Sequence, residues 1–211
     1  MKLYSDSLID RDSYYKQVIA IRKLPVENGS LKVKVLLPST DKNKKKKMKD
    51  LNNSVSLYKE QLKKGDIQKA YKGLIRYVMS LKSHLARTLT ETYSFGNVSL
   101  GYMDYTYFYC IDSYLRERKL RFCIVLNHEK MRFELWLVGQ NSEIQKKYWN
   151  ILKDTDWNKH QTSMPKYSVL EYVLIENPDF NNLKVLTKQI EKELVSTANE
   201  VIEYLREGDS K

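Results

Sequence analysis

The chain has 211 residues, of which 42% are hydrophobic and 30% charged, the proportions of an ordinary globular protein. Its apolar runs are far shorter than the ~18–20 residues needed to cross a bilayer, and its first residues lack the apolar stretch of a signal peptide. Two cysteines are too few for a disulfide framework. We therefore expect a cytoplasmic protein with no membrane partner.

The formal net charge of +11 is concentrated near the N-terminus. Residues 1–65 hold 16 Lys+Arg and 7 Asp+Glu, whereas residues 66–211 hold 21 and 19. Lysine-rich runs are usually solvated, which predicts a linker over residues 38–50. The alternative is a tether that binds polyanions by releasing counterions. Its candidate residues are Lys44, Lys45, Lys46 and Lys47.

An N-terminal β-hairpin segment is predicted for residues 1–37. Apolar residues alternate along 31–37, and residues 25–29 supply turn formers between this run and residues 14–24. A lone hairpin is marginal in water, so it must dock on the main body, on a protein partner or on a second copy in a homo-oligomer.

The main domain is predicted for residues 51–211 and begins with helices. A short helix is expected over 54–63, ending at Gly65. Asp66 then caps a long helix whose apolar positions from Ile67 to Leu85 recur every three or four residues.

Strands follow. The tyrosine-rich segment 102–110 favours a strand, and residues 119–126 and 131–138 form a hairpin around the turn 127–130. Apolar residues then face one another and build one hydrophobic side. The predicted pairs are Leu126–Met131, Ile124–Phe133, Phe122–Leu135 and Leu120–Leu137.

A helix over 142–152, a strand near 167–175 and a C-terminal helix over 181–206 complete the pattern. The fold class is therefore α+β. It has a central, mostly antiparallel sheet in the order helix-strand-strand-strand-helix-strand-helix, packed with helices and preceded by the small hairpin.

Three segments carry a family resemblance: 64–74, 101–104 and 128–137. Over about residues 57–152 the chain resembles a family of small, uncharacterised bacterial domains found largely in clostridia. The resemblance implies no activity, because none is known for the family.

The element order is also similar to that of restriction-endonuclease-like folds. Those nucleases hold a metal with an acid on the second core strand and an acid-x-Lys on the third. Here 119–126 contains no acid, and Glu134 is followed at the lysine position by Trp136. If the fold is related, nuclease chemistry is expected to be lost.

The predicted hairpin places polar side chains opposite the apolar pairs, with Arg121 facing Trp136. Such a face suits a planar or anionic ligand. Either Asp104 and Thr106 or the tyrosine row of 103–109 would join it. The candidate ligand-binding residues are Arg121, Arg132, Glu134 and Trp136, with Cys123 facing Glu134 and Val125 facing Arg132.

Three functions remain open. The first is a non-catalytic module that binds nucleic acid, a nucleotide or a protein; the second is a divergent metal-dependent nuclease using Glu134 and Asp104; the third is an adaptor or oligomerisation protein. No catalytic, metal or cofactor motif is present. If Trp136 is partly exposed beside Arg121, we expect it to contact ligand; burial with Glu134 paired to Arg132 favours a structural role.

Overall fold

The computed structural model describes residues 42–209, and their side chains from residue 51 onward. The predicted hairpin segment 1–37 lies outside the described residues. The chain divides into two units at a boundary between Ala70 and Tyr71. The boundary falls inside helix α3 (Asp66–Thr88).

Helix α2 (Lys42–Lys64) is longer than the sequence predicts. Residues 42–50, expected to be linker, form its first turns, and the expected helix 54–63 is only its C-terminal part. The sequence did not predict helix over 42–50 because a lysine run lacks a core-facing stripe of its own, yet lysine is a good helix former. Gly65, with φ of 80°, ends the helix in a left-handed conformation that favours glycine.

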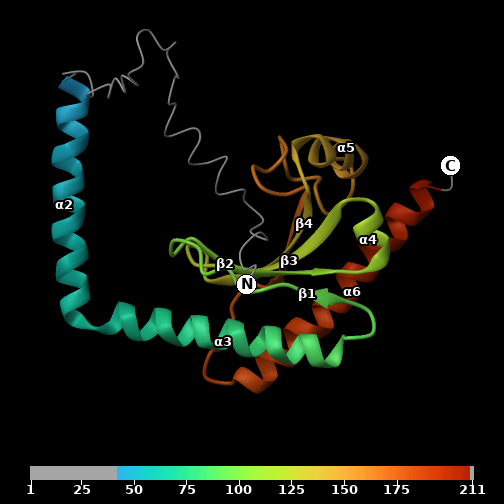
Figure 1. The fold of residues 1–211 in the computed structure, drawn as a ribbon, viewed down its shortest axis with the longest axis horizontal. Helices are drawn as coiled ribbons and strands as arrows, with labels where there is room; N and C mark the ends of the chain where they lie inside the picture. The colour runs from blue at the N-terminus through green and yellow to red at the C-terminus, as the bar shows by residue number, and fades with distance from the viewer. Residues whose placement is uncertain (1–41, 210–211) are drawn as a thin grey trace, which may run out of the picture. The chain divides into compact units, whose positions relative to one another are not determined.

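The second unit is built on a five-stranded sheet in the order β1-β2-β3-β4-β5, and all its pairings are antiparallel (Figure 1). The predicted α+β class and antiparallel sheet are therefore confirmed. The strands are β1 (Ser94–Phe95), β2 (Tyr105–Ile111), β3 (Leu120–Asn127), β4 (Arg132–Gly139) and β5 (Leu170–Ile175). The short β1 is an addition to the predicted order.

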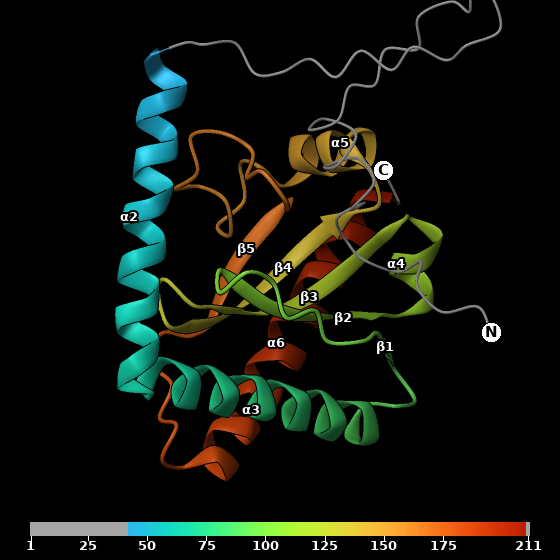
Figure 2. The same ribbon diagram turned by 60° about the vertical axis from the view of Figure 1, so that its left-hand side comes forward.

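Three further helices are present: α4 (Ser113–Glu117) between β2 and β3, α5 (Ser142–Leu152) between β4 and β5, and α6 (Leu183–Asp209) after β5. The side chains of Asp112 and Asn141 cap α4 and α5 by accepting hydrogen bonds from backbone N–H groups of the first turn. Helices α3 and α6 lie on the same side of the sheet (Figure 2).

The central hairpin forms as predicted, but its cross-strand partners differ by two residues. Leu126 pairs with Phe133 instead of Met131, and Ile124 pairs with Leu135 instead of Phe133. The shift arises because Met131 adopts φ of 47° and belongs to the turn, not to β4. A shift of two residues preserves which side of the sheet each side chain occupies.

The hydrophobic core lies between one side of this sheet, which we call the first face, and helices α3, α5 and α6. The five residues predicted to be core are buried there: Leu120, Phe122, Ile124, Phe133 and Leu135. Tyr77 of α3 contacts Phe133 edge-on, with 5.8 Å between ring centroids. Helices thus close the first face, and any functional surface on the sheet must use the other.

Candidate functional site

The opposite side of the sheet, the second face, carries all four predicted ligand-binding residues. Their positions follow from the register of β2 to β5, in which side chains alternate between faces. The second face consists of Tyr105, Tyr107 and Tyr109 on β2; Arg121, Cys123, Val125 and Asn127 on β3; Arg132, Glu134, Trp136 and Val138 on β4; and Glu171 and Val173 on β5.

The partners within this face differ from the prediction, again by two residues. Arg121 pairs with Val138 instead of Trp136, and Cys123 pairs with Trp136 instead of Glu134. Val125 faces Glu134 rather than Arg132. The predicted residues therefore separate into two places: Arg121 near the start of β3, and a cluster centred on Glu134.

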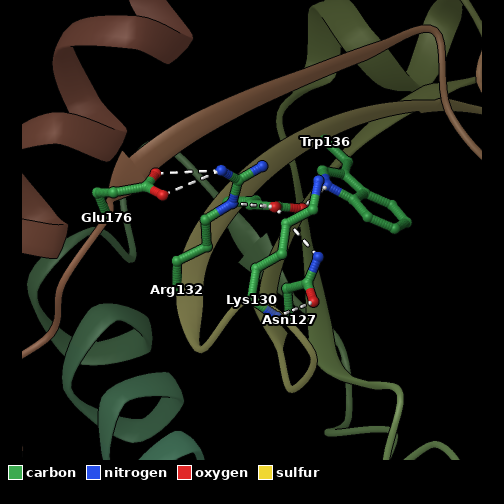
Figure 3. Close-up of polar contacts among 6 residues, drawn as sticks. Asn127, Lys130, Arg132, Trp136 and Glu176 are labelled. Carbon is green, nitrogen blue, oxygen red and sulfur yellow. Dashed lines mark hydrogen bonds and ion pairs between the residues drawn. The ribbon is translucent and has the colours of Figure 1, made fainter.

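Glu134 is only 2% exposed, and its carboxylate accepts three hydrogen bonds (Figure 3). Oε1 accepts from Arg132 Nε at 2.6 Å and from Asn127 Nδ2 at 3.2 Å, and Oε2 accepts from Trp136 Nε1 at 2.8 Å. These three donors, one of them the guanidinium of Arg132, offset the free-energy cost of burying the negative charge of Glu134 away from water.

Arg132 links this buried carboxylate to the surface. Its Nη1 donates to Glu176, whose side chain is 58% exposed, at 3.1 Å from Oε2 (Figure 3). The two carboxylates raise the pKa of Arg132 despite its partial burial, which acts to lower that pKa. The positive charge of Arg132 is therefore balanced by two carboxylates, Glu134 and Glu176, which makes it a poor candidate for pairing with an anionic ligand.

Trp136 is 7% exposed, so its indole is not available as an open stacking surface. The ring contacts Tyr105 edge-on, with 5.0 Å between centroids, and its N–H is used by Glu134. The condition for direct ligand contact by Trp136 is not met, and its contacts are those expected of a structural residue.

The side chain of Asn127 connects the turn after β3 to the Glu134 cluster. Its amide donates to Glu134, and its Oδ1 accepts from the backbone N–H of Lys130 at 3.1 Å. The same side chain therefore closes the turn and satisfies the buried carboxylate.

The aromatic part of the second face is the row Tyr105, Tyr107 and Tyr109, which we call the tyrosine row. All three rings are half-buried. Tyr109 lies against Gly96, where an added Cβ would stand 2.1 Å from its Cε1 atom, so only glycine fits under the ring. The guanidinium of Arg121 also lies over this ring, 5.3 Å from its centroid.

Arg121 differs from Arg132 in its charge environment. No carboxylate within residues 51–209 forms an ion pair with Arg121, and its side chain is half-buried. Within residues 51–209 it is therefore a cation near an aromatic ring whose charge no ion pair balances.

Asp104 and Thr106 do not join the second face. Thr106 is fully buried on the first face, and Asp104 Oδ1 accepts from the backbone N–H groups of Tyr102 and Tyr105 at 2.8 and 2.7 Å. These hydrogen bonds outweigh burial and lower the pKa of Asp104. Across residues 51–209, no group of three or more His, Cys, Asp and Glu side chains is placed to hold a metal ion.

The three segments that carry the family resemblance meet at one end of the sheet. The ring of Tyr71 lies 5.8 Å from that of His128, and its hydroxyl donates to the Leu100 carbonyl at 3.3 Å. The His128 backbone N–H donates to the Asp104 carbonyl at 2.9 Å. Burial lowers the pKa of His128, and the negative charge of Asp104 partly opposes that effect.

Sequence reasoning left the tyrosine row as one of two alternatives, and it did not identify Gly96 or Glu176. The faces of β2 and β3 can be related only through their register. That register depends on residues 112–119, which contain α4 and Lys119 with φ of 58°. The alternation of residues within β2 or β3 does not predict the conformation of this connection, and so does not predict which residues of the two strands share a face.

Comparison with known proteins gives a family. Residues 51–205 match the family described as Domain of unknown function (DUF7000). The chain belongs to this family. The match extends beyond residues 57–152, where the resemblance was recognised, and includes β5 and nearly all of α6. No curated protein and no solved structure matches the chain.

Proposed function

We propose that this domain is a non-catalytic binding module that takes single-stranded nucleic acid on its second face. Bases would stack on the tyrosine row, and Arg121 would pair with a phosphate. The observation that carries the proposal is the row of partly exposed tyrosine rings beside an arginine with no carboxylate partner in the described chain.

The chemistry of the row supports this ligand class. Side chains two residues apart on a strand lie ~7 Å apart, a spacing that an extended single strand can match with successive unstacked bases. Every base has an aromatic face, so stacking on tyrosine requires no particular sequence. The positive charge of Arg121 favours a ligand that carries phosphate groups over a neutral aromatic ligand.

The Glu134 cluster then has a supporting role. Its hydrogen bonds hold Trp136, whose ring contacts Tyr105 at the end of the tyrosine row. A rigid layer beneath and beside the rings reduces the entropy lost when a ligand orders them. Glu134 and Trp136 are thus positioning residues in this proposal.

The nuclease alternative receives no comparable support. Glu134 is occupied by three donors, and Asp104 is occupied by its own loop. Within residues 51–209, neither carboxylate belongs to a group of three or more His, Cys, Asp and Glu side chains that could hold a metal ion.

The proposal is tested by fluorescence anisotropy with a labelled oligothymidine of about 12 nucleotides, titrated between about 50 and 300 mM NaCl. We expect affinity to fall steeply with salt, and Arg121→Ala to weaken binding about tenfold and to reduce the salt dependence. Tyr107→Leu, which keeps an apolar side chain but removes the ring, should weaken binding by about tenfold as well.

The matched control is Arg76→Ala, which removes the same charge from an exposed position on α3. If Arg76→Ala and Arg121→Ala weaken binding equally, the binding is non-specific attraction to a basic protein. If the wild-type protein does not bind the oligonucleotide, the proposed ligand class is wrong.

A further inference from the structure

Helix α2 joins in one element the lysine run and the short helix that the sequence predicts over 54–63. It holds nine lysines and two acidic residues, a net charge of +7, and also a series of apolar positions. Residues 51, 55, 58 and 62 recur at spacings of four, three and four, which places them along one side of the helix. The structure thus makes the lysine run and the apolar stripe parts of one amphipathic helix.

The apolar stripe, defined as Leu51, Val55, Tyr58 and Leu62, is largely exposed. Leu51 is 63%, Val55 53% and Tyr58 58% exposed to solvent. Leu57, at 60%, lies on the other side of the helix. Exposed apolar side chains at helical spacing on a strongly basic helix are typical of helices that lie at a membrane surface.

The charges of α2 favour a partner with negative charge. Its first turn contains no acidic residue and begins with Lys42, although the N-terminal end of a helix carries the positive end of the dipole. Asn52, Asn53 and Ser54 at its centre are weak helix formers. An anionic surface would offset the lysine repulsion, and an apolar layer beneath it would bury the stripe.

We propose that α2 binds the surface of an anionic lipid bilayer, with the apolar stripe inserted at the headgroup boundary and the lysines on the lipid phosphates. Nothing in this contact spans the membrane: no helix within residues 42–209 is long and apolar enough to do so. In this proposal the polyanion that the predicted lysine tether binds is the anionic lipid surface. The proposal departs from the expectation of no membrane partner, because it makes α2 a peripheral membrane contact.

Other occupants fit the helix less well. A second copy would bring two helices of net charge +7 together, and three half-exposed side chains bury far less area than a stable dimer interface needs. Nucleic acid would satisfy the lysines but would leave the apolar stripe in water. A bilayer containing anionic lipid satisfies both.

The test uses the full-length protein and flotation with vesicles of phosphatidylcholine, alone or with about 30% phosphatidylglycerol. We expect binding only to the anionic vesicles. Leu51→Ser combined with Val55→Ser should lower the partition coefficient about tenfold or more at unchanged charge. Replacing Lys44, Lys45, Lys46 and Lys47 with glutamine should lower it by about two orders of magnitude at unchanged apolar surface.

The matched control is Leu57→Ser, which removes an equally exposed apolar side chain from the other side of α2 and should leave binding unchanged. Insertion is read directly by Tyr58→Trp, whose added fluorescence should be quenched by brominated lipid, whereas that of Leu57→Trp should not. None of these variants lies in the folded second unit, so a loss of binding is not explained by unfolding.

Three outcomes would overturn the proposal. If the stripe variant binds anionic vesicles as tightly as the wild type, the attraction is electrostatic only. If light scattering finds a dimer that the stripe variant dissociates, the stripe belongs to a contact with a second copy. If the lysine variant loses oligonucleotide affinity while the wild type shows no vesicle binding, the helix binds nucleic acid.

Discussion

The two faces of the sheet are closed in different ways by alternate residues of the same strands. On the first face, aromatic and aliphatic side chains such as Phe122 and Phe133 are covered by helices and are fully buried. On the second face, Glu134 and Trp136 are buried as well, but hydrogen bonds join Glu134 to both Trp136 and Arg132. One face therefore depends on packing and the other on a polar network.

This difference indicates where function can reside. A face covered by helices has no free surface, and its residues can be exchanged only for others of similar volume. On the second face, the tyrosine row and Arg121 stay in partial contact with solvent. The second face can thus be both well ordered and accessible.

The largest expected effect is on the first face. Phe133→Ala should lower the free energy of unfolding by about 3–5 kcal/mol, because it leaves a cavity between the sheet and α3. Chemical denaturation measures this loss. A change below about 1 kcal/mol would mean that Phe133 is not packed as described.

A smaller effect is expected at the adjacent residue on the second face. Glu134→Gln should cost about 1–3 kcal/mol, because all three partners are donors and one oxygen becomes an NH₂ group. The exposed Glu176 supplies the control: Glu176→Gln should change stability by less than about 0.5 kcal/mol. Equal effects of the two variants would show that the buried network contributes no more than a surface ion pair.

The smallest effect concerns the helices that close the first face. Glu191 of α6 pairs with His84 of α3 at 2.9 Å. Burial acts to raise the pKa of Glu191, but hydrogen bonds from Thr88 and His84 outweigh it, so this pKa lies below its usual value. A lowered carboxyl pKa contributes stability above the unfolded-state pKa of about 4.3 and loses it as pH falls through the folded-state value.

We therefore expect Glu191→Gln to be less stable than the wild type by up to about 1 kcal/mol at pH 6, and the difference to shrink toward pH 3. Denaturation midpoints across this pH range provide the measurement. If the stability difference between the wild type and Glu191→Gln grows as the pH falls, the folded protein does not stabilise the charged form of Glu191, and the account of this pair is wrong.

Much of the sheet could be predicted from alternation alone. The apolar residues of β3 and β4 identify the first face, and the four polar candidates are on the second face even though every predicted pair was off by two. The error came from Met131, since a left-handed methionine in a turn leaves no sequence signal of the kind that glycine or asparagine would.

The site could be predicted only in part, because its character depends on contacts between strands. The sequence identifies Glu134 and Arg132 as candidates for ligand binding. It does not show that their side chains form an ion pair with each other, which leaves less of their charge for a ligand. Likewise, the helical conformation of residues 42–50 was not predicted, because lysine is both a solvated residue and a helix former, and composition alone does not decide which conformation forms.

The most direct test of the second face as a binding surface is a map of amide chemical-shift changes on adding oligothymidine to the isotope-labelled protein. The account predicts that the largest changes occur at Tyr105, Tyr107, Tyr109 and Arg121, with α3 and α6 unaffected. Changes confined to helices α3 and α6, or to the lysines of α2, would contradict the assignment of the ligand to the sheet.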